Sequence, residues 1–270
     1  FKMILNIKHQ TTYNFYSSVP RLVQSLKLYP SNCKNQKVIK WNISASMGQL
    51  CKSHQDALGH TIYNIYNERL IGEQTIVSEG KINTKDFNGV MHGLMDKVNP
   101  FCFLRFTYLT KPGEKLIKLS KKIKKKNDQI QFCHDLNTLV SEIINFKTGI
   151  TNNQTTAEES LNLEKGVCQD YAHILMSLSK IFNIPSRYVN GYLMDDNNIS
   201  SYSSHAWVEI YINDLGWVGF DPSHKRCIDE NYVRISCGYD FIDASPIKGV
   251  KLNYLGEEAL NFKLDINIEQ

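Results

Sequence analysis

The first third of the chain alternates between apolar and polar residues in short runs. Turn-forming residues such as Pro30-Ser31-Asn32 and Met47-Gly48 separate these runs. A period of two places successive side chains on opposite faces of a strand. The pattern predicts antiparallel β-structure in a sandwich-like sheet that packs on itself or on a neighbour, with strands at Ile4–Ile7, Ser25–Tyr29, Val38–Ser44 and Thr61–Tyr66.

The period changes from two towards 3.6 at Leu109–Gly113, and two helices are expected next, at Glu114–Lys126 and Asp128–Ile144. We place a domain boundary at this change. It divides the chain into a β-rich N-terminal domain, residues 1–110, and a second domain, residues 111–270.

The second domain should combine buried helices with an antiparallel sheet, as an α+β fold. Thr155-Thr156-Ala157-Glu158 has capping-box spacing for a short helix that Gly166 can end in a left-handed conformation. The segment Cys168–Phe182 is apolar on most sides and predicts a buried helix that Pro185 stops. Its polar stripe consists of His173, Ser177 and Lys180. The strands expected after it are Arg187–Met194, Ser204–Ile212 and Trp217–Asp221.

The composition is that of a folded globular protein. Hydrophobic residues make up 42% of the 270 positions and charged residues 21%, which argues against disorder and against a fibrous repeat. The net charge is +4, and its basic excess gathers in the lysine run at 121–126, expected to be the solvated face of a helix. No aromatic residues are interleaved with these lysines, so no nucleic-acid partner is predicted.

Cysteine usage and hydropathy bear on the compartment. Seven cysteines occur without a C-x-x-C pair, so neither a disulfide scaffold nor a zinc knuckle is expected. This pattern fits a reducing compartment, and a cytoplasmic location is the expectation. No apolar stretch has the length of a membrane span and no signal peptide is recognised, so no membrane partner is expected. The sequence does not indicate an oligomeric state.

Cys168 is the strongest candidate nucleophile. It follows Gly166-Val167 at the start of the buried helix, where unpaired backbone N–H groups and the helix dipole favour a thiolate. A cysteine is far more often a small buried hydrophobe than a nucleophile, so Cys168 needs a base nearby.

His205 and Asp221 can supply that base and its orienting carboxylate. His205 begins a strand in which it shares a face with Trp207 and Glu209, opposite the apolar face. Asp221 ends the next strand. A three-residue loop at Asn213–Leu215 with Gly216 at a bulge would bring His205 and Asp221 to one face of a hairpin. Asp221 could then fix the tautomer of His205 so that the imidazole takes a proton from Cys168.

The remaining histidines are weaker candidates. His173 lies on the polar stripe of its helix and points away from Cys168. His224 is near enough to Asp221 to compete with His205 as the base, but it lies in a polar turn beyond Pro222. No metal site and no cofactor are predicted, because the other five histidines have no partner at metal-ligand spacing: His9, His54, His60, His92 and His134.

Three motifs in this order resemble the transglutaminase-like superfamily in its bacterial form: Gly166 to His173, Ser204 to Glu209 and Trp217 to Pro222. The segments Tyr13 to Pro30 and Asp243 to Val250 are also similar, so the likeness covers nearly the whole chain. It implies a bacterial transglutaminase-like N-terminal region and a papain-like core with Cys168, His205 and Asp221 as its triad.

The resemblance leaves the reaction open. A thioester on cysteine can be hydrolysed, aminolysed or deamidated, and we favour hydrolysis of a peptide or amide bond in a peptide or protein substrate. A protein-glutamine gamma-glutamyltransferase or deamidase is the first alternative. A non-catalytic binding scaffold is the second, although the intact Cys, His and Asp argue against it.

Three further expectations concern the surroundings of the site. The backbone N–H of Cys168 should form part of an oxyanion hole, with Gln154 or Gln169 as possible second donors. The connection Asp195–Ser203 is short beside many relatives and could leave the cleft open. Calcium binding at Asp195–Asn198 is less expected than a solvated turn.

Overall fold

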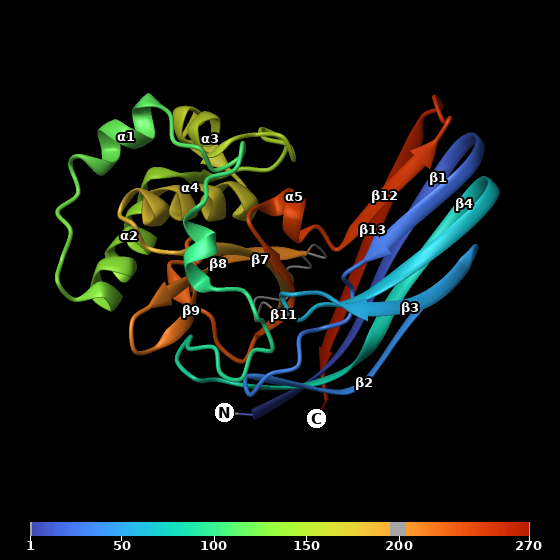
Figure 1. Cartoon of the computed structure of the whole chain (residues 1–270), viewed down its shortest axis with the longest axis horizontal. Helices are drawn as coiled ribbons and strands as arrows, with labels where there is room; N and C mark the ends of the chain where they lie inside the picture. Colours follow the sequence, from blue (N-terminus) through green and yellow to red (C-terminus); the bar gives the residue numbers. More distant parts are fainter. Residues whose placement is uncertain (1, 195–203, 270) are drawn as a thin grey trace.

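A computed structural model of the chain describes residues 2–194 and 204–269. The fold is mixed, with antiparallel sheets, and Figure 1 shows a helical layer, a central sheet and a long N-terminal sheet in succession. This confirms the predicted α+β class with an N-terminal β domain. The connection predicted to be short, at Asp195–Ser203, and the calcium-binding alternative at Asp195–Asn198 lie outside the described residues.

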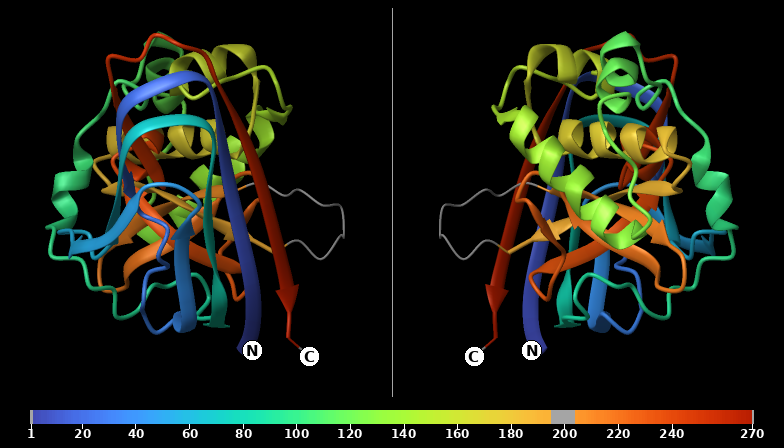
Figure 2. Two further views of the ribbon diagram at one scale, coloured as in Figure 1. Left: turned by 90° about the vertical axis from the view of Figure 1, so that its right-hand side faces the viewer. Right: turned by 90° about the vertical axis from the view of Figure 1, so that its left-hand side faces the viewer.

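Two strands of 25 residues form the centre of the N-terminal sheet. β1 (Lys2–Leu26) pairs antiparallel with β4 (Thr61–Lys85), and the register shifts between Phe15 and Val19. The shorter β2 (Gln36–Ala45) and β3 (Gln49–Gln55) pair with β4. The predicted strands at 4–7 and 61–66 were therefore too short, because the chain bends at the shift and keeps its pairing (Figure 2).

The end of the chain completes this sheet. β12 (Ile247–Leu252) and β13 (Glu258–Ile268) both pair antiparallel with β1. The last strands therefore belong to the N-terminal sheet, although they lie within the range 111–270 predicted as the second domain. The boundary at residue 110 stays a prediction.

The central sheet has the order β10-β9-β8-β7-β11. Neighbouring strands run antiparallel throughout it. It packs against the N-terminal sheet through apolar side chains that include Leu5, Ile82 and Val233. The predicted packing of the first sheet on a neighbour is therefore observed. The strands are β7 (Ser186–Leu193), β8 (His205–Ile212), β9 (Gly216–Asp221), β10 (Arg226–Cys227) and β11 (Tyr232–Gly238).

Helices cover the other face of the central sheet (Figure 1). α4 (Cys168–Ile181) packs directly on β7 and β8, and its residues 170–180 are all buried. The other elements are η1 (Pro100–Leu104), α1 (Glu114–Ser120), α2 (Gln129–Ile143), α3 (Ala157–Leu163), α5 (Phe241–Ala244) and the short strands β5 (Asn145–Phe146) and β6 (Lys165–Gly166).

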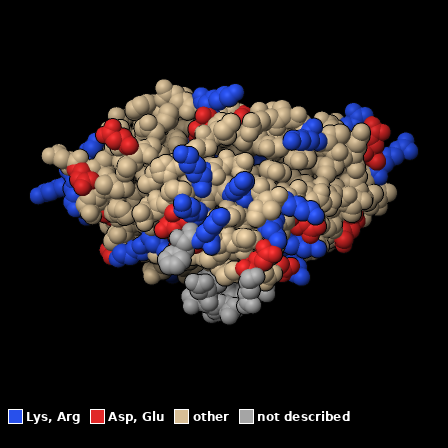
Figure 3. Space-filling view, turned by 90° about the horizontal axis from the view of Figure 1, so that it is seen from below, with Lys and Arg blue, Asp and Glu red and all other residues tan. Residues whose placement is uncertain are grey.

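The lysine run is exposed but not helical. α1 ends at Ser120, so the prediction that this helix reaches Lys126 was wrong. Consecutive positive charges repel each other along a helix and disfavour its continuation. Figure 3 shows basic and acidic side chains both scattered over one face of the molecule. The absence of a nucleic-acid partner stays a prediction.

The polar stripe of α4 is buried together with the rest of this helix. His173 is fully covered, and its Nε2 accepts a hydrogen bond from the backbone N–H of Phe241 at 3.2 Å. Lys180 donates to the backbone oxygen of Arg105 at 3.0 Å. Burial lowers the pKa of His173 to about 3 and that of Lys180 to about 7. Segments distant in sequence thus cover this face of the helix.

Glu209 is also buried, although the alternation of residues along β8 placed it on the face opposite the apolar side chains. Its carboxylate accepts hydrogen bonds from Arg187 Nε at 2.6 Å and Arg234 Nε at 2.8 Å. All three side chains are at most 3% exposed. The second face of the central sheet is therefore a covered surface that contains an ionic network.

Candidate active site

Cys168 is the first residue of α4 and is half-buried. The start of this helix is fixed by Asp170, whose buried carboxylate accepts hydrogen bonds from the backbone N–H of Val167 at 2.8 Å, Thr151 Oγ1 at 2.6 Å and Ser160 Oγ at 2.8 Å. Asp170 was not among the site residues predicted from the sequence. Its position three residues past the N-cap is a recognisable signal for a capping carboxylate.

Gly166 has a different role from the one expected. Glu164, at φ 52°, adopts the left-handed conformation that ends α3, so the assignment of this conformation to Gly166 was wrong. A Cβ at position 166 would lie 2.6 Å from Asp170 Oδ2. Glycine is therefore required here because the capping carboxylate packs directly against the backbone.

The predicted hairpin between β8 and β9 is present. Ile212 pairs with Gly216, which leaves Asn213–Leu215 as a three-residue loop, as expected. Gly216 has φ 83° and makes no bulge in the register, so the predicted bulge is absent. Because the loop length is odd, the side chain of Asp221 reaches the face occupied by His205.

The structure brings Cys168, His205 and Asp221 together. His205 Nε2 donates to Asp221 Oδ2 at 2.6 Å, and the Cys168 thiol lies close enough to the same imidazole to raise its pKa. With Nε2 occupied by Asp221, Nδ1 is the ring nitrogen available to the thiol. The arrangement places an imidazole between a sulfur and a carboxylate, which is the order needed for nucleophilic catalysis by cysteine.

The electrostatics of the site favour a charged imidazole. Burial opposes the charge on His205, but Asp221 and Cys168 outweigh it and raise the pKa of His205 to about 10. Burial likewise opposes ionisation of Asp221, yet His205 and His224 hold the pKa of that carboxyl well below its usual value. The stable form of the pair is therefore an imidazolium on a carboxylate.

His224, weighed as a rival base, contacts Asp221 and not Cys168 among the described hydrogen bonds. Its Nδ1 donates to Asp221 Oδ2 at 2.8 Å, and its ring centroid lies 5.1 Å from that of His205. The facing atoms of His205, Asp221 and His224 all lie within 4.8 Å of one another, a spacing that a metal ion could bridge. The N···O distances of 2.6 and 2.8 Å are hydrogen-bond lengths, so the geometry is that of a hydrogen-bonded array.

Two residues near the triad had not been identified from the sequence. Tyr232 on β11 donates its hydroxyl to Asp221 Oδ2 at 2.8 Å, and Arg226 Nε donates to the same hydroxyl at 3.0 Å. β11 pairs with β7 and lies three strands from β9 in the sheet. No local motif could have shown that Tyr232 reaches Asp221, because the contact depends on how the whole sheet is ordered.

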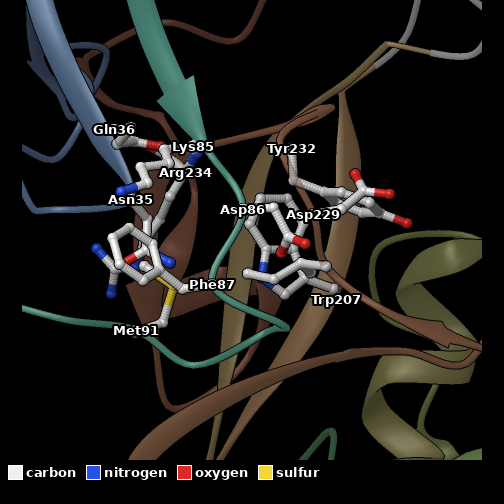
Figure 4. Close-up of a pocket in the computed structure, with 11 residues that line it drawn as sticks. Asn35, Gln36, Lys85, Asp86, Phe87, Met91, Trp207, Asp229, Tyr232 and Arg234 are labelled. Carbon is white, nitrogen blue, oxygen red and sulfur yellow. Dashed lines mark hydrogen bonds between the residues drawn. The ribbon is translucent and has the colours of Figure 1, made fainter. Parts of the chain in front are cut away.

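A small pocket lies beside these residues. Trp207 and Tyr232 line one side of it in Figure 4, with Asn35, Gln36 and Arg234 across from them. The indole of Trp207 is fully buried, stacks near His205 at 6.3 Å between ring centroids, and has no hydrogen-bond partner for Nε1 within the described parts of the chain. The room available, about 10 Å³, is that of roughly one water molecule.

The two glutamines considered as oxyanion donors lie near the start of α4. Gln169 Nε2 donates to the backbone oxygen of Asn152 at 3.4 Å. Gln154 lines an open groove of about 490 Å³ together with Tyr108, Asn152 and other residues of the same loop and of α3. Both assignments stay predictions.

A second Cys–His–Asp set occurs elsewhere in the fold. His60 Nδ1 pairs with Asp56 Oδ2 at 2.8 Å, and His60 Nε2 accepts the backbone N–H of Cys237 at 2.9 Å. Cys237 and His60 are at most 1% exposed. A substrate has no access to this set, so it joins the N-terminal sheet to β11 and does not compete with the first site.

Comparison with known proteins agrees with this geometry. The family model of the Transglutaminase-like superfamily matches residues 117–222, which include Cys168, His205 and Asp221. The model of the Bacterial transglutaminase-like N-terminal region matches residues 5–83, which form most of the N-terminal sheet. Together the two matches account for more than half of the chain.

The curated relatives are themselves uncharacterized. One protein of Mycobacterium leprae is 31% identical over 131 residues, 47% of this chain and 44% of that protein. A protein of Mycobacterium bovis is 24% identical over 151 residues, 52% of this chain and 48% of that protein. The chain thus spans about half the length of the curated relatives it matches.

Among solved structures, a candidate cysteine protease from Cytophaga hutchinsonii aligns with a TM-score of 0.77 and 18% identity, over 100% of this chain and 93% of that chain. At this identity the likeness shows a shared fold. No helix within 2–194 or 204–269 has the length and apolar character needed to cross a membrane. The chain belongs to the transglutaminase-like superfamily and has the bacterial transglutaminase-like N-terminal region, on the fold of cysteine-type enzymes.

Proposed function

We propose that this protein is a cysteine-nucleophile acyl-transfer enzyme that hydrolyses a peptide or amide bond through a thioester. The observation that carries the proposal is the cluster of Cys168, His205 and Asp221, with Cys168 at the first position of a buried helix. The substrate is a peptide or protein. A cytoplasmic location remains a prediction.

Cys168 is the nucleophile of the proposed reaction, and His205 acts first as an acid and then as a base. The Cys168 thiolate attacks the carbonyl carbon and forms a tetrahedral oxyanion. The His205 imidazolium then gives its proton to the leaving nitrogen as the C–N bond breaks, which leaves a thioester and a neutral imidazole. His205 next removes a proton from water, the hydroxide attacks the thioester, and the acid and the thiol are released.

Asp221 and the helix start stabilise the charges in these steps. Asp221 keeps Nε2 of His205 engaged, so the other nitrogen faces the reacting atoms. The backbone N–H of Cys168, at the first position of α4, has no partner within that helix and can donate to the oxyanion. Asp170 holds this helix start in place without touching the reacting atoms.

Reactivity of the thiol tests the proposal directly. Iodoacetamide labelling at pH 6, mapped by mass spectrometry, should modify Cys168 rapidly in the wild type and far more slowly in His205→Ala. The other six cysteines serve as internal controls, because free thiols are mainly protonated at this pH. Equal or absent labelling of Cys168 in both proteins would support the non-catalytic scaffold instead.

The acyl acceptor distinguishes hydrolysis from the alternative transglutaminase or deamidase reactions. A glutamine-containing peptide library should be incubated with the enzyme in the presence and absence of a labelled primary alkylamine. Hydrolysis predicts shortened peptides in both samples. A transglutaminase would attach the amine to glutamine, and a deamidase would convert glutamine to glutamate without shortening the peptide.

A further inference from the structure

One oxygen atom of Asp221 accepts three hydrogen bonds. Oδ2 receives His205 Nε2 at 2.6 Å, His224 Nδ1 at 2.8 Å and Tyr232 Oη at 2.8 Å. The other oxygen, Oδ1, accepts from the backbone N–H and the hydroxyl of Ser223 at 2.9 and 2.7 Å. A carboxylate oxygen has two lone pairs, so three donors on Oδ2 must share its accepting capacity.

The directions of two of these bonds are fixed by chemistry. Arg226 Nε can only donate, so the lone pair of the Tyr232 hydroxyl faces Arg226 and its proton is directed at Asp221. Burial and Asp221 both raise the pKa of Tyr232, so the phenol keeps that proton. Asp221 is fully buried and ionised, so His224 Nδ1 must likewise donate to it.

We propose that Tyr232 and His224 are positioning residues that share Oδ2 of Asp221 with His205 and thereby weaken the hold of Asp221 on the imidazolium proton. The proposal rests on the proposed function, since it concerns the same Cys–His pair. An imidazolium held only by Asp221 would be a poor acid, because proton donors work best when their pKa lies near the operating pH. The two extra donors withdraw negative charge from the oxygen that His205 faces.

The charged and titratable groups around the imidazole can all be named from the described contacts. Cys168 approaches from α4, Asp221 from the end of β9, His224 from the turn after β9 and Tyr232 from β11. Arg226, on β10, acts through Tyr232 and pairs more distantly with Asp229 at 3.7 Å. Tyr232 and His224 are the two donors to Oδ2 of Asp221 that lie outside the triad.

The variants Tyr232→Phe and His224→Ala test the proposal by their effect on pH dependence. Loss of either donor should raise the pH at which His205 loses its proton by roughly one unit, the size expected for a hydrogen bond to a charged group. The lower pH limit of rapid Cys168 alkylation should stay where it is, because His205 is already protonated at low pH in every variant. The pH range of the thiolate–imidazolium pair therefore extends at its upper limit.

Both limits can be measured without a known substrate. The lower limit comes from the rate of iodoacetamide labelling of Cys168 in the full chain between pH 4 and pH 10. The upper limit comes from an NMR titration of the His205 ring after ¹⁵N labelling of the histidines. His224→Asn should restore the wild-type limits, because the asparagine Nδ2 can take the place of the imidazole Nδ1 donor. His54→Ala, at an exposed position on β3, is the matched control.

An upper limit that is unmoved or lowered in both variants would overturn the proposal. A lower labelling rate with unchanged limits would show a purely structural role. His224 has a side-chain exposure of 38%, so His224→Ala still decides the question if Tyr232→Phe does not fold. If the wild type is not labelled at low pH, the proposed function itself fails.

Discussion

Replacement of Glu209 by glutamine should strongly destabilise the fold. Glu209 is fully buried and accepts from Arg187 Nε at 2.6 Å and from Arg234 Nε and Nη2 at 2.8 and 3.3 Å. Glutamine has nearly the same volume, so packing is retained while the negative charge is lost. One end of the new amide would present N–H groups to a guanidinium, donor against donor.

The expected cost follows from the loss of one charge between two buried cations. Arg187 keeps its contact with Asp96, and Arg234 keeps Ser31 Oγ at 2.5 Å, so the cations are not left without partners. Removing one member of a buried ion pair costs about 3–5 kcal/mol. Against a total stability of about 5–15 kcal/mol this is a large fraction.

Urea unfolding followed by circular dichroism measures this cost. With a slope near the upper end of the usual range, the midpoint should fall by about 1 M or more. Glu79→Gln is the control, because Glu79 pairs with Lys8 at 3.5 Å on the surface and its loss should cost about 0–1 kcal/mol. A loss in Glu209→Gln no larger than in Glu79→Gln would refute the reasoning, and so would a gain in stability.

Three further predictions follow from the site and its supports. Asp221→Asn should slow alkylation of Cys168 at pH 6 by about 10-fold or more, because the pKa of His205 falls without the carboxylate. An unchanged rate would show that Asp221 does not act on His205. Gly166→Ala should lower the melting temperature by several degrees, since its Cβ would meet Asp170 Oδ2 at 2.6 Å; a melting temperature equal to that of the wild type would contradict the required close approach. Burial lowers the pKa of Lys180 to about 7 from an unfolded value of about 10.4. Between these two pH values the unfolded chain binds more protons than the folded chain, so the free energy of unfolding should rise with pH from about 7 to 10. Lys180→Met should flatten that rise in urea midpoints measured at pH 7 and pH 9.5, and an unchanged slope would assign it to other groups.

The sequence predicted the parts of the site that depend on local structure. The helix start at Cys168 and the odd loop before Gly216 follow from periodicity and turn chemistry over a few residues. These two features are sufficient to place Cys168, His205 and Asp221 near one another once the hairpin is packed on the helix.

The parts that were missed depend on contacts between distant segments. Tyr232 reaches Asp221 only through the strand order of the central sheet, and Lys180 is buried only because the Arg105 segment covers it. Strand length was underestimated for a related reason. Polar residues between Ile7 and Ser25 interrupt the alternation, yet β1 stays extended because β4 on one side and β12 and β13 on the other hold its backbone hydrogen bonds.

The pairing of β12 and β13 with β1 has a consequence for biosynthesis. The ribosome synthesises β1 well before β12 and β13. Until residues 247–268 emerge, a 25-residue strand has one edge of backbone N–H and C=O groups without its final partners. Such an edge is a template for pairing with another chain. The nascent protein therefore has an open sheet edge while residues 27–246 are synthesised, and its protection from aggregation in that period depends on chaperones or on the speed of elongation.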